Sequence, residues 1–184
     1  MKKGKMFLTT LMLGLFCVSS AVFAEDVPYT LAQLQELQKD SPVSFAADGI
    51  IGECYIQGNC VFKDGQKLAK NTTKGLQLLE RAAEKHPESA FNVGDYYLNG
   101  TQGVAKDYVK AHKYLQKAAD AGDERAMYLL AAMYMTGNAK PDGSTPADLV
   151  AMGLLMNACQ KGLKEACAHL SVEEDGNVTN INIK

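Results

Sequence analysis

The sequence predicts an all-α protein in which short helix hairpins stack side by side as an α-solenoid. Small, aliphatic and tyrosine residues recur at helical spacing, and a glycine follows each such run. The same pattern then returns at a period of about 40 residues, which is typical of helical repeats. Because one hairpin cannot bury its own apolar face, at least three copies must stack to make a core.

The N-terminus has the anatomy of a secretory signal peptide. Three lysines precede an apolar run, which ends in Val-Phe-Ala at residues 22–24. This order predicts a signal peptide over residues 1–24 that is cleaved before Glu25. A membrane anchor is the alternative, because residues 6–24 approach the length that spans a bilayer. Threonines and serines shorten its apolar centre, however, and this favours cleavage.

The charge of the processed chain excludes one class of partner. The whole chain has 19 Lys+Arg and 21 Asp+Glu, and the signal contains three of the lysines and none of the acids. The processed chain therefore has a net charge of about −5 and no basic patch, so nucleic acid is not expected as a partner. No later stretch is long and apolar enough to cross a membrane. We expect a periplasmic or secreted protein without membrane insertion after cleavage.

The clearest repeat lies at residues 89–123. In its first helix Ser89, Val93, Gly94 and Tyr97 share one face, and Gly100 ends the helix. The equivalent positions 37 residues later and 42 residues earlier hold Ala126, Leu130, Ala131, Tyr134 and Gly137, and Ala47, Ile51, Gly52, Tyr55 and Gly58. A fourth copy begins at Ala166 and fails, because Glu174 stands at the tyrosine position.

The second helix of each hairpin repeats as well. Lys110, Ala111, Tyr114 and Ala118 correspond to Lys74, Gly75, Leu78 and Ala82, and more loosely to Val150, Ala151, Leu154 and Ala158. Small residues at these positions let neighbouring helix axes approach closely. We expect an N-terminal capping helix within residues 25–43, a solenoid over residues 44–172 and a polar tail over residues 173–184.

These residues resemble the Sel-like (Sel-one class) repeat, a relative of the tetratricopeptide repeat. Residues 103–111, Gly-Val-Ala-Lys-Asp-Tyr-Val-Lys-Ala, match the centre of that family's pattern, whereas the loop at residues 138–146 is enlarged. The resemblance implies a right-handed solenoid of about three hairpins. It also implies that the outward face of the first helices lines a concave groove that holds peptide or protein.

Two disulfides are expected, because four cysteines remain after processing of an exported chain. In the repeat register, Cys159 ends one second helix and Cys167 begins the next first helix. Their eight-residue spacing is similar to that of the disulfides in secreted, cysteine-rich members of the family. We pair Cys54 with Cys60 and Cys159 with Cys167. Crossed pairs would join distant units of a stack in which only neighbours touch.

No catalytic constellation is present. The chain lacks the motifs of serine hydrolases, zinc proteases and phosphate-binding loops, and its three histidines lie in different repeats, at His86, His112 and His169. Asp107 is expected to cap its helix. We therefore predict no enzyme activity, no metal and no cofactor. The alternative is a β-lactam-binding or hydrolysing enzyme, because some cysteine-rich relatives are reported to act in that way.

The remaining candidates are surface residues of the first helices. Glu53, Phe91, Asp95, Asn99 and Tyr128 are predicted to bind a protein or peptide in the concave groove. The open alternative is that the aromatic rings pack against neighbouring units or against a cap. The predicted function is an exported protein–protein interaction module. A special case of it is an immunity or inhibitor protein against a toxin or hydrolase that acts in the periplasm.

Overall fold

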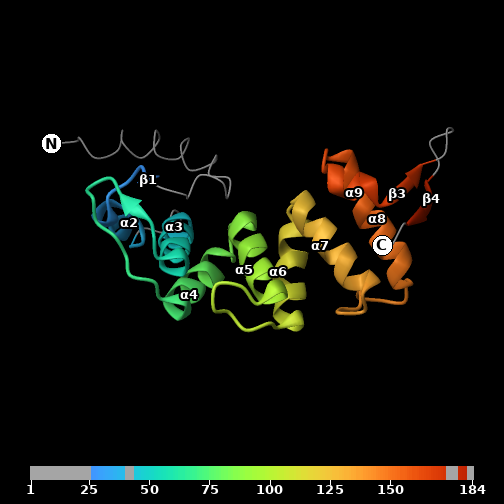
Figure 1. Ribbon diagram of the computed structural model, residues 1–184, viewed down its shortest axis with the longest axis horizontal. Helices are drawn as coiled ribbons and strands as arrows, with labels where there is room; N and C mark the ends of the chain where they lie inside the picture. Colours follow the sequence, from blue (N-terminus) through green and yellow to red (C-terminus); the bar gives the residue numbers. More distant parts are fainter. Residues whose placement is uncertain (1–25, 40–43, 173–177, 182–184) are drawn as a thin grey trace. The chain divides into compact units, whose positions relative to one another are not determined.

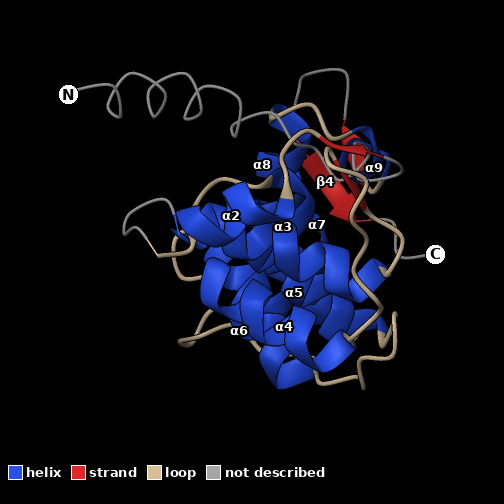
Figure 2. Cartoon of the chain, turned by 90° about the vertical axis from the view of Figure 1, so that its left-hand side faces the viewer, coloured by secondary structure: helices blue, strands red, loops and turns tan. Residues whose placement is uncertain are grey.

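The computed structural model describes residues 26–39, 44–172 and 178–181, and most of these residues are helical (Figure 1). The predicted signal peptide, residues 1–24, lies outside the described residues and stays a prediction. The chain divides into two compact units, Met1–Leu78 and Leu79–Lys184. Within the described residues, strands are confined to two short pairs, and the predicted all-α solenoid class is confirmed (Figure 2).

The first unit is built around the first hairpin and the segment that precedes it. Its elements are β1 (Asp26–Val27), α2 (Leu31–Leu37), α3 (Ser44–Gln57), β2 (Val61–Phe62) and the start of α4 (Thr72–Ala82). β1 pairs in parallel with β2, so the segment before α2 lies beside the segment after α3. The core contains Val27, Leu34, Leu37, Ala47, Ile50, Ile51, Cys54, Cys60 and Phe62.

Local chemistry sets the ends of these helices. The Thr30 hydroxyl accepts from the Gln33 backbone N–H at 3.1 Å, and the Gln33 side chain accepts from the Thr30 N–H at 2.9 Å. This reciprocal cap begins α2, which lies within the range 25–43 where the capping helix is expected. Gly58 follows α3 with a φ of 72°, a conformation that favours glycine.

The second unit contains the remaining hairpins. Its elements are α5 (Pro87–Asn99), α6 (Tyr108–Asp120), α7 (Glu124–Met135), α8 (Ala147–Gln160), α9 (Lys164–Ala168), β3 (Leu170–Val172) and β4 (Val178–Ile181). Each helix from α5 to α8 packs against the next helix along the chain (Figure 1). Most apolar positions of the repeat pattern are buried where these helices meet. Among them are Val93, Ala111, Ala118, Leu130 and Ala158, each 0 % exposed, whereas Leu154 is half-buried.

The second hairpin shows how the sequence places its helices. Pro87 occupies the first turn of α5, where its missing N–H costs nothing, and Gly100 ends α5 in the left-handed conformation. Asp107 precedes α6, and its side chain accepts from the Lys110 N–H at 3.0 Å. The predicted capping role of Asp107 is thus confirmed.

The array ends as a short helix and a strand pair. Ala166, the start of the failed fourth copy, is fully buried in α9, which is only 5 residues long. β3 then pairs antiparallel with β4, with Leu170 opposite Ile181. Part of the segment predicted to be a polar tail is therefore a strand in the second unit.

Candidate binding surface on the first helices

The candidate surface lies on α5 and α7, the first helices of two successive hairpins. We call the outward residues Phe91, Asp95, Asn99, Arg125 and Tyr128 the first-helix surface. Four of the five are half-buried and Asn99 is exposed. They project from α5 and α7 because the opposite sides of these helices, which carry Val93 and Leu130, face the core.

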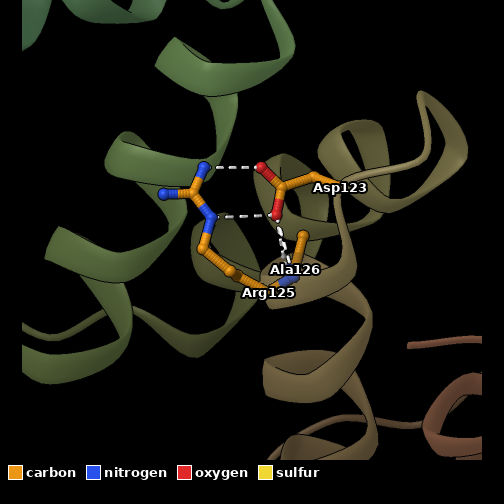
Figure 3. A network of polar contacts seen from close by, with 3 residues as sticks. All are labelled: Asp123, Arg125 and Ala126. Carbon is orange, nitrogen blue, oxygen red and sulfur yellow. Dashed lines mark hydrogen bonds and ion pairs between the residues drawn. The ribbon is translucent and has the colours of Figure 1, made fainter. Parts of the chain in front are cut away.

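Phe91 and Arg125 join the two helices of this surface. The guanidinium carbon of Arg125 lies 4.1 Å from the centre of the Phe91 ring, which is a cation–π contact. Arg125 also donates from Nη2 to Asp123 Oδ2 at 2.8 Å and from Nε to Asp123 Oδ1 at 3.3 Å (Figure 3). The ring of Phe91 is therefore covered on one side by a cation that Asp123 holds in place.

The electrostatics of this contact favour a charged Arg125. Burial acts against the charge, but the hydrogen bond and the negative charge of Asp123 outweigh it, and the pKa of Arg125 is raised. Asp123 also caps α7, because its Oδ1 accepts from the backbone N–H groups of Arg125 at 2.9 Å and Ala126 at 3.0 Å (Figure 3). One carboxylate thus fixes both the helix start and the arginine.

Tyr128 is held in a comparable way by the end of the array. Its hydroxyl lies 3.2 Å from Nε2 of His169, and the two rings are 5.6 Å apart at 43°. His169 follows directly after α9. The two predicted anchors, Phe91 and Tyr128, therefore each contact the next repeat and keep part of the ring exposed. These contacts are the ones that the open alternative, packing against neighbouring repeats, predicts, and the binding role of the two rings stays a prediction.

Asp95 and Asn99 form a polar pair one helical turn apart. Asn99 Nδ2 donates to Asp95 Oδ1 at 2.7 Å. Burial raises the pKa of the Asp95 carboxyl, and this hydrogen bond opposes the rise only in part. Among the described residues, no cationic side chain forms an ion pair with Asp95. Asp95 is therefore a partly desolvated carboxylate without a counter-charge in this part of the chain.

Glu53 occupies the position in α3 that corresponds to Asp95. It repeats the polar pair, because Gln57 Nε2 donates to Glu53 Oε1 at 3.0 Å, four residues along the helix. Glu53 is only 5 % exposed, however, so it does not present the surface that the sequence predicted. α3 is the first helix after the cap, and α2 packs against it. Gln38 after α2 donates to the buried Asp48 of α3 at 2.7 Å.

The repeated tyrosines have a structural role that the pattern did not reveal. Tyr97 donates to Glu80 Oε1 at 2.8 Å and accepts from Lys110 Nζ at 3.0 Å. Tyr134, one repeat later, donates to Gln116 Oε1 at 3.2 Å, and Gln116 is the counterpart of Glu80. Each ring thus bridges the second helix of the preceding hairpin to its own repeat. The sequence signal that could have indicated this role is the recurrence of a polar residue at equivalent positions of the second helices, Glu80 and Gln116, which are 36 residues apart.

The histidines and acids do not gather into a metal site. In the described ranges, no three His, Cys, Asp or Glu side chains come together in a way that could hold an ion. His112 Nε2 lies 2.8 Å from the Tyr134 hydroxyl, which gives this imidazole a packing role. No helix within the same ranges is both long and apolar enough to span a bilayer.

The cysteines pair as predicted. Cys54 is joined to Cys60 with 5.3 Å between their Cα atoms, and Cys159 to Cys167 with 4.8 Å. The first pair is buried in the core of its unit, whereas the second is half-buried and ties α8 to α9. Disulfides persist in oxidising compartments, so these pairs indicate a location outside the cytoplasm.

Comparison with known proteins identifies the repeats. The model of the Sel1 repeat family matches residues 50–86, 87–123 and 124–150. A Sel1 repeat protein of Oxalobacter formigenes superimposes with a TM-score of 0.60 at 25% identity, over 75% of this chain and 94% of that one. The protective antigen c5321 of uropathogenic Escherichia coli, which displays an SLR fold, gives 0.48 at 20% identity, over 75% and 34%.

A curated relative matches this chain over a short segment. The HRD3A component of an ERAD-associated E3 ubiquitin-protein ligase from Arabidopsis thaliana is 38% identical over 63 residues. The match covers 34% of this chain and only 9% of that protein. It therefore indicates a shared repeat segment.

Proposed function

Because the chain belongs to the Sel1 repeat family, we propose that it binds a polypeptide partner through the first-helix surface. Sel1 repeats generally serve as protein–protein interaction modules and are generally not catalytic. The surface belongs to the face that is concave in tetratricopeptide-like stacks, where peptides and proteins commonly bind. We propose that the protein catalyses nothing and needs no cofactor.

The observation that supports this most strongly is the arrangement of the two aromatic rings. Phe91 and Tyr128 occupy equivalent positions on α5 and α7, and each is held on one side by a charged or polar partner, Arg125 or His169. Rings that are already fixed lose little conformational freedom on binding, which is the property of effective anchors. A partner that covers their exposed parts would bury apolar surface across both helices.

We further propose that this binding takes place in the periplasm or outside the cell. The signal-peptide pattern of residues 1–24 and the two disulfides support that location. An inhibitor or immunity protein against a toxin or hydrolase would be a special case of the same binding. The described residues contain no constellation that favours the β-lactam alternative.

Site-specific photo-crosslinking in intact cells tests the proposal. A photoreactive residue at Asn99, on the first-helix surface, should capture a protein partner, which mass spectrometry then identifies. The same residue at Val109 is a matched control, because Val109 is 82 % exposed but lies on the second helix α6. An adduct that forms equally at both positions, or at Val109 alone, would contradict the proposed surface.

A further inference from the structure

The Asp95–Asn99 pair on the first-helix surface leaves two acceptor atoms without a donor from the described residues. Asn99 uses its Nδ2 group to donate to Asp95 Oδ1 at 2.7 Å. Oδ2 of Asp95 and Oδ1 of Asn99 are then acceptors that bond to no other described residue. A carboxylate oxygen and an amide oxygen, side by side at one turn of a helix, call for a group with several N–H donors.

The described part of the protein does not provide that donor. Helix α5 contains Glu88 and Asp95 and not one lysine or arginine. Arg125, the cation of the neighbouring helix, is bound to Asp123 and stacked on Phe91. The partly desolvated Asp95 carboxylate therefore lowers the stability of the unbound protein. A cation from a partner would offset this desolvation cost.

The acceptor pair is specific to the second repeat. One repeat later, the positions of Asp95 and Asn99 hold Ala132 and Thr136, and the Thr136 hydroxyl donates to the backbone carbonyl of Ala132 at 2.8 Å. That site offers an apolar surface and no carboxylate. The first-helix surface thus combines one anionic site on α5 with the two aromatic rings of Phe91 and Tyr128.

We infer that the bound polypeptide inserts an arginine at Asp95 and Asn99 and places apolar side chains over Phe91 and Tyr128. This inference rests on the proposed function and names its partner class, a cationic segment with apolar neighbours. Arginine fits better than lysine, because its planar fork presents several N–H groups to two acceptors at once. Its aliphatic stem also packs well beside an aromatic ring.

Peptide selection followed by a charge-neutral substitution tests this inference. A phage library of random dodecapeptides is selected on the purified protein, and an enriched peptide is synthesised with arginine or with citrulline, which is nearly isosteric but neutral. Fluorescence anisotropy then gives the two dissociation constants. We expect enrichment of arginine, and binding about tenfold weaker or worse with citrulline, because the charge-assisted hydrogen bonds are lost.

Two variants of the protein test whether the preference for arginine depends on Asp95. Asp95→Asn keeps an acceptor for Asn99 but removes the charge, and it should weaken the arginine peptide about as much as citrulline does. Asp120→Asn is the control, because Asp120 also accepts from an amide one helical turn away, Gln116 Nε2 at 2.7 Å, but lies on α6. This control should bind the arginine peptide as the wild type does.

The results separate this inference from the proposed function. Enriched peptides without arginine, or equal binding of the citrulline form, would overturn the inference. The proposed function would stand in that case if replacing Phe91 and Tyr128 with alanine abolished their binding. Failure to enrich any peptide on the wild-type protein would contradict both.

Discussion

Gly94 of α5 lies so close to Leu115 of α6 that a Cβ atom at residue 94 would come within 2.7 Å of the Leu115 Cγ atom and 3.1 Å of its backbone nitrogen. The hairpin therefore depends on the absence of a side chain at this position. In the first unit Gly75 has the same relationship with α3, where a Cβ atom would lie 2.6 Å from the Gly52 carbonyl oxygen. Close helix contact is thus repeated along the chain.

Gly94→Ala should lower the free energy of unfolding by about 1–3 kcal/mol, because overpacking exceeds the gain in helix propensity. Gly153→Ala is the matched control, since Gly153 lies within α8 with nothing within 4 Å of a Cβ atom. The control should gain about 0.5–1 kcal/mol from helix propensity alone. Urea denaturation measures both values, and an equal gain in the two variants would contradict the packing account.

Tyr97→Phe should destabilise the protein by about 1 kcal/mol, because it removes the hydroxyl that joins Glu80 to Lys110. Tyr108→Phe is the control, because Tyr108 is 38 % exposed and its hydroxyl forms none of the described hydrogen bonds. The free energies of unfolding of both variants are compared with that of the wild type. Equal values for the two variants would mean that the tyrosine bridge adds nothing to stability.

Replacing Cys159 and Cys167 with serine should loosen the end of the array. Helix α9 is 5 residues long and cannot persist without tertiary contacts, so the disulfide holds it and the following His169 in place. A loss of about 2–3 kcal/mol is expected on the chain-entropy model. Hydrogen exchange should accelerate in α9 and hardly change in α5. Acceleration throughout the second unit would show instead that this disulfide supports the whole unit.

Stability should fall on acidification because of His86. Burial lowers the pKa of His86 below its usual 6.5, so the folded protein favours the neutral ring. The unfolded chain binds the proton first, and stability is therefore present above pH 6.5 and is lost as the pH falls towards the folded-state pKa. Urea denaturation at pH 7.5 and pH 5 should show a smaller loss in His86→Gln. An identical loss in both proteins would exclude His86 as the cause.

The sequence predicted the fold well because its signal is repeated. The positions of Val93, Gly94 and Tyr97 recur twice, so each copy supports the assignment of the others, and the structure confirms the helices and both disulfides. The surface was harder to predict, because exposure depends on what covers a helix. Glu53 has the pattern position of Asp95 but lies on the first helix after the cap and is buried.

The side-chain contacts between repeats were also not predicted from the sequence. Arg125 was not a candidate, since a helical pattern places it beside the core positions but cannot show that it reaches Phe91 on another helix. The Tyr97–Glu80 hydrogen bond likewise joins two hairpins. Such contacts follow from the spacing and rotation of neighbouring repeats, which the period of one chain does not specify.

The central claim, that the first-helix surface binds the partner, is tested most directly by one double variant. Phe91→Ala with Tyr128→Ala should weaken binding of the cross-linked partner by about 2 kcal/mol or more, because the two anchors are lost. Tyr108→Ala with Val109→Ala, on the exposed face of α6, is the control and should bind normally. Calorimetric titration and thermal melting are run on both variants.

We predict that the first-helix variant loses binding with a small change in melting temperature. Normal binding by that variant would contradict the account and would place the contact elsewhere, such as the loop at residues 138–146.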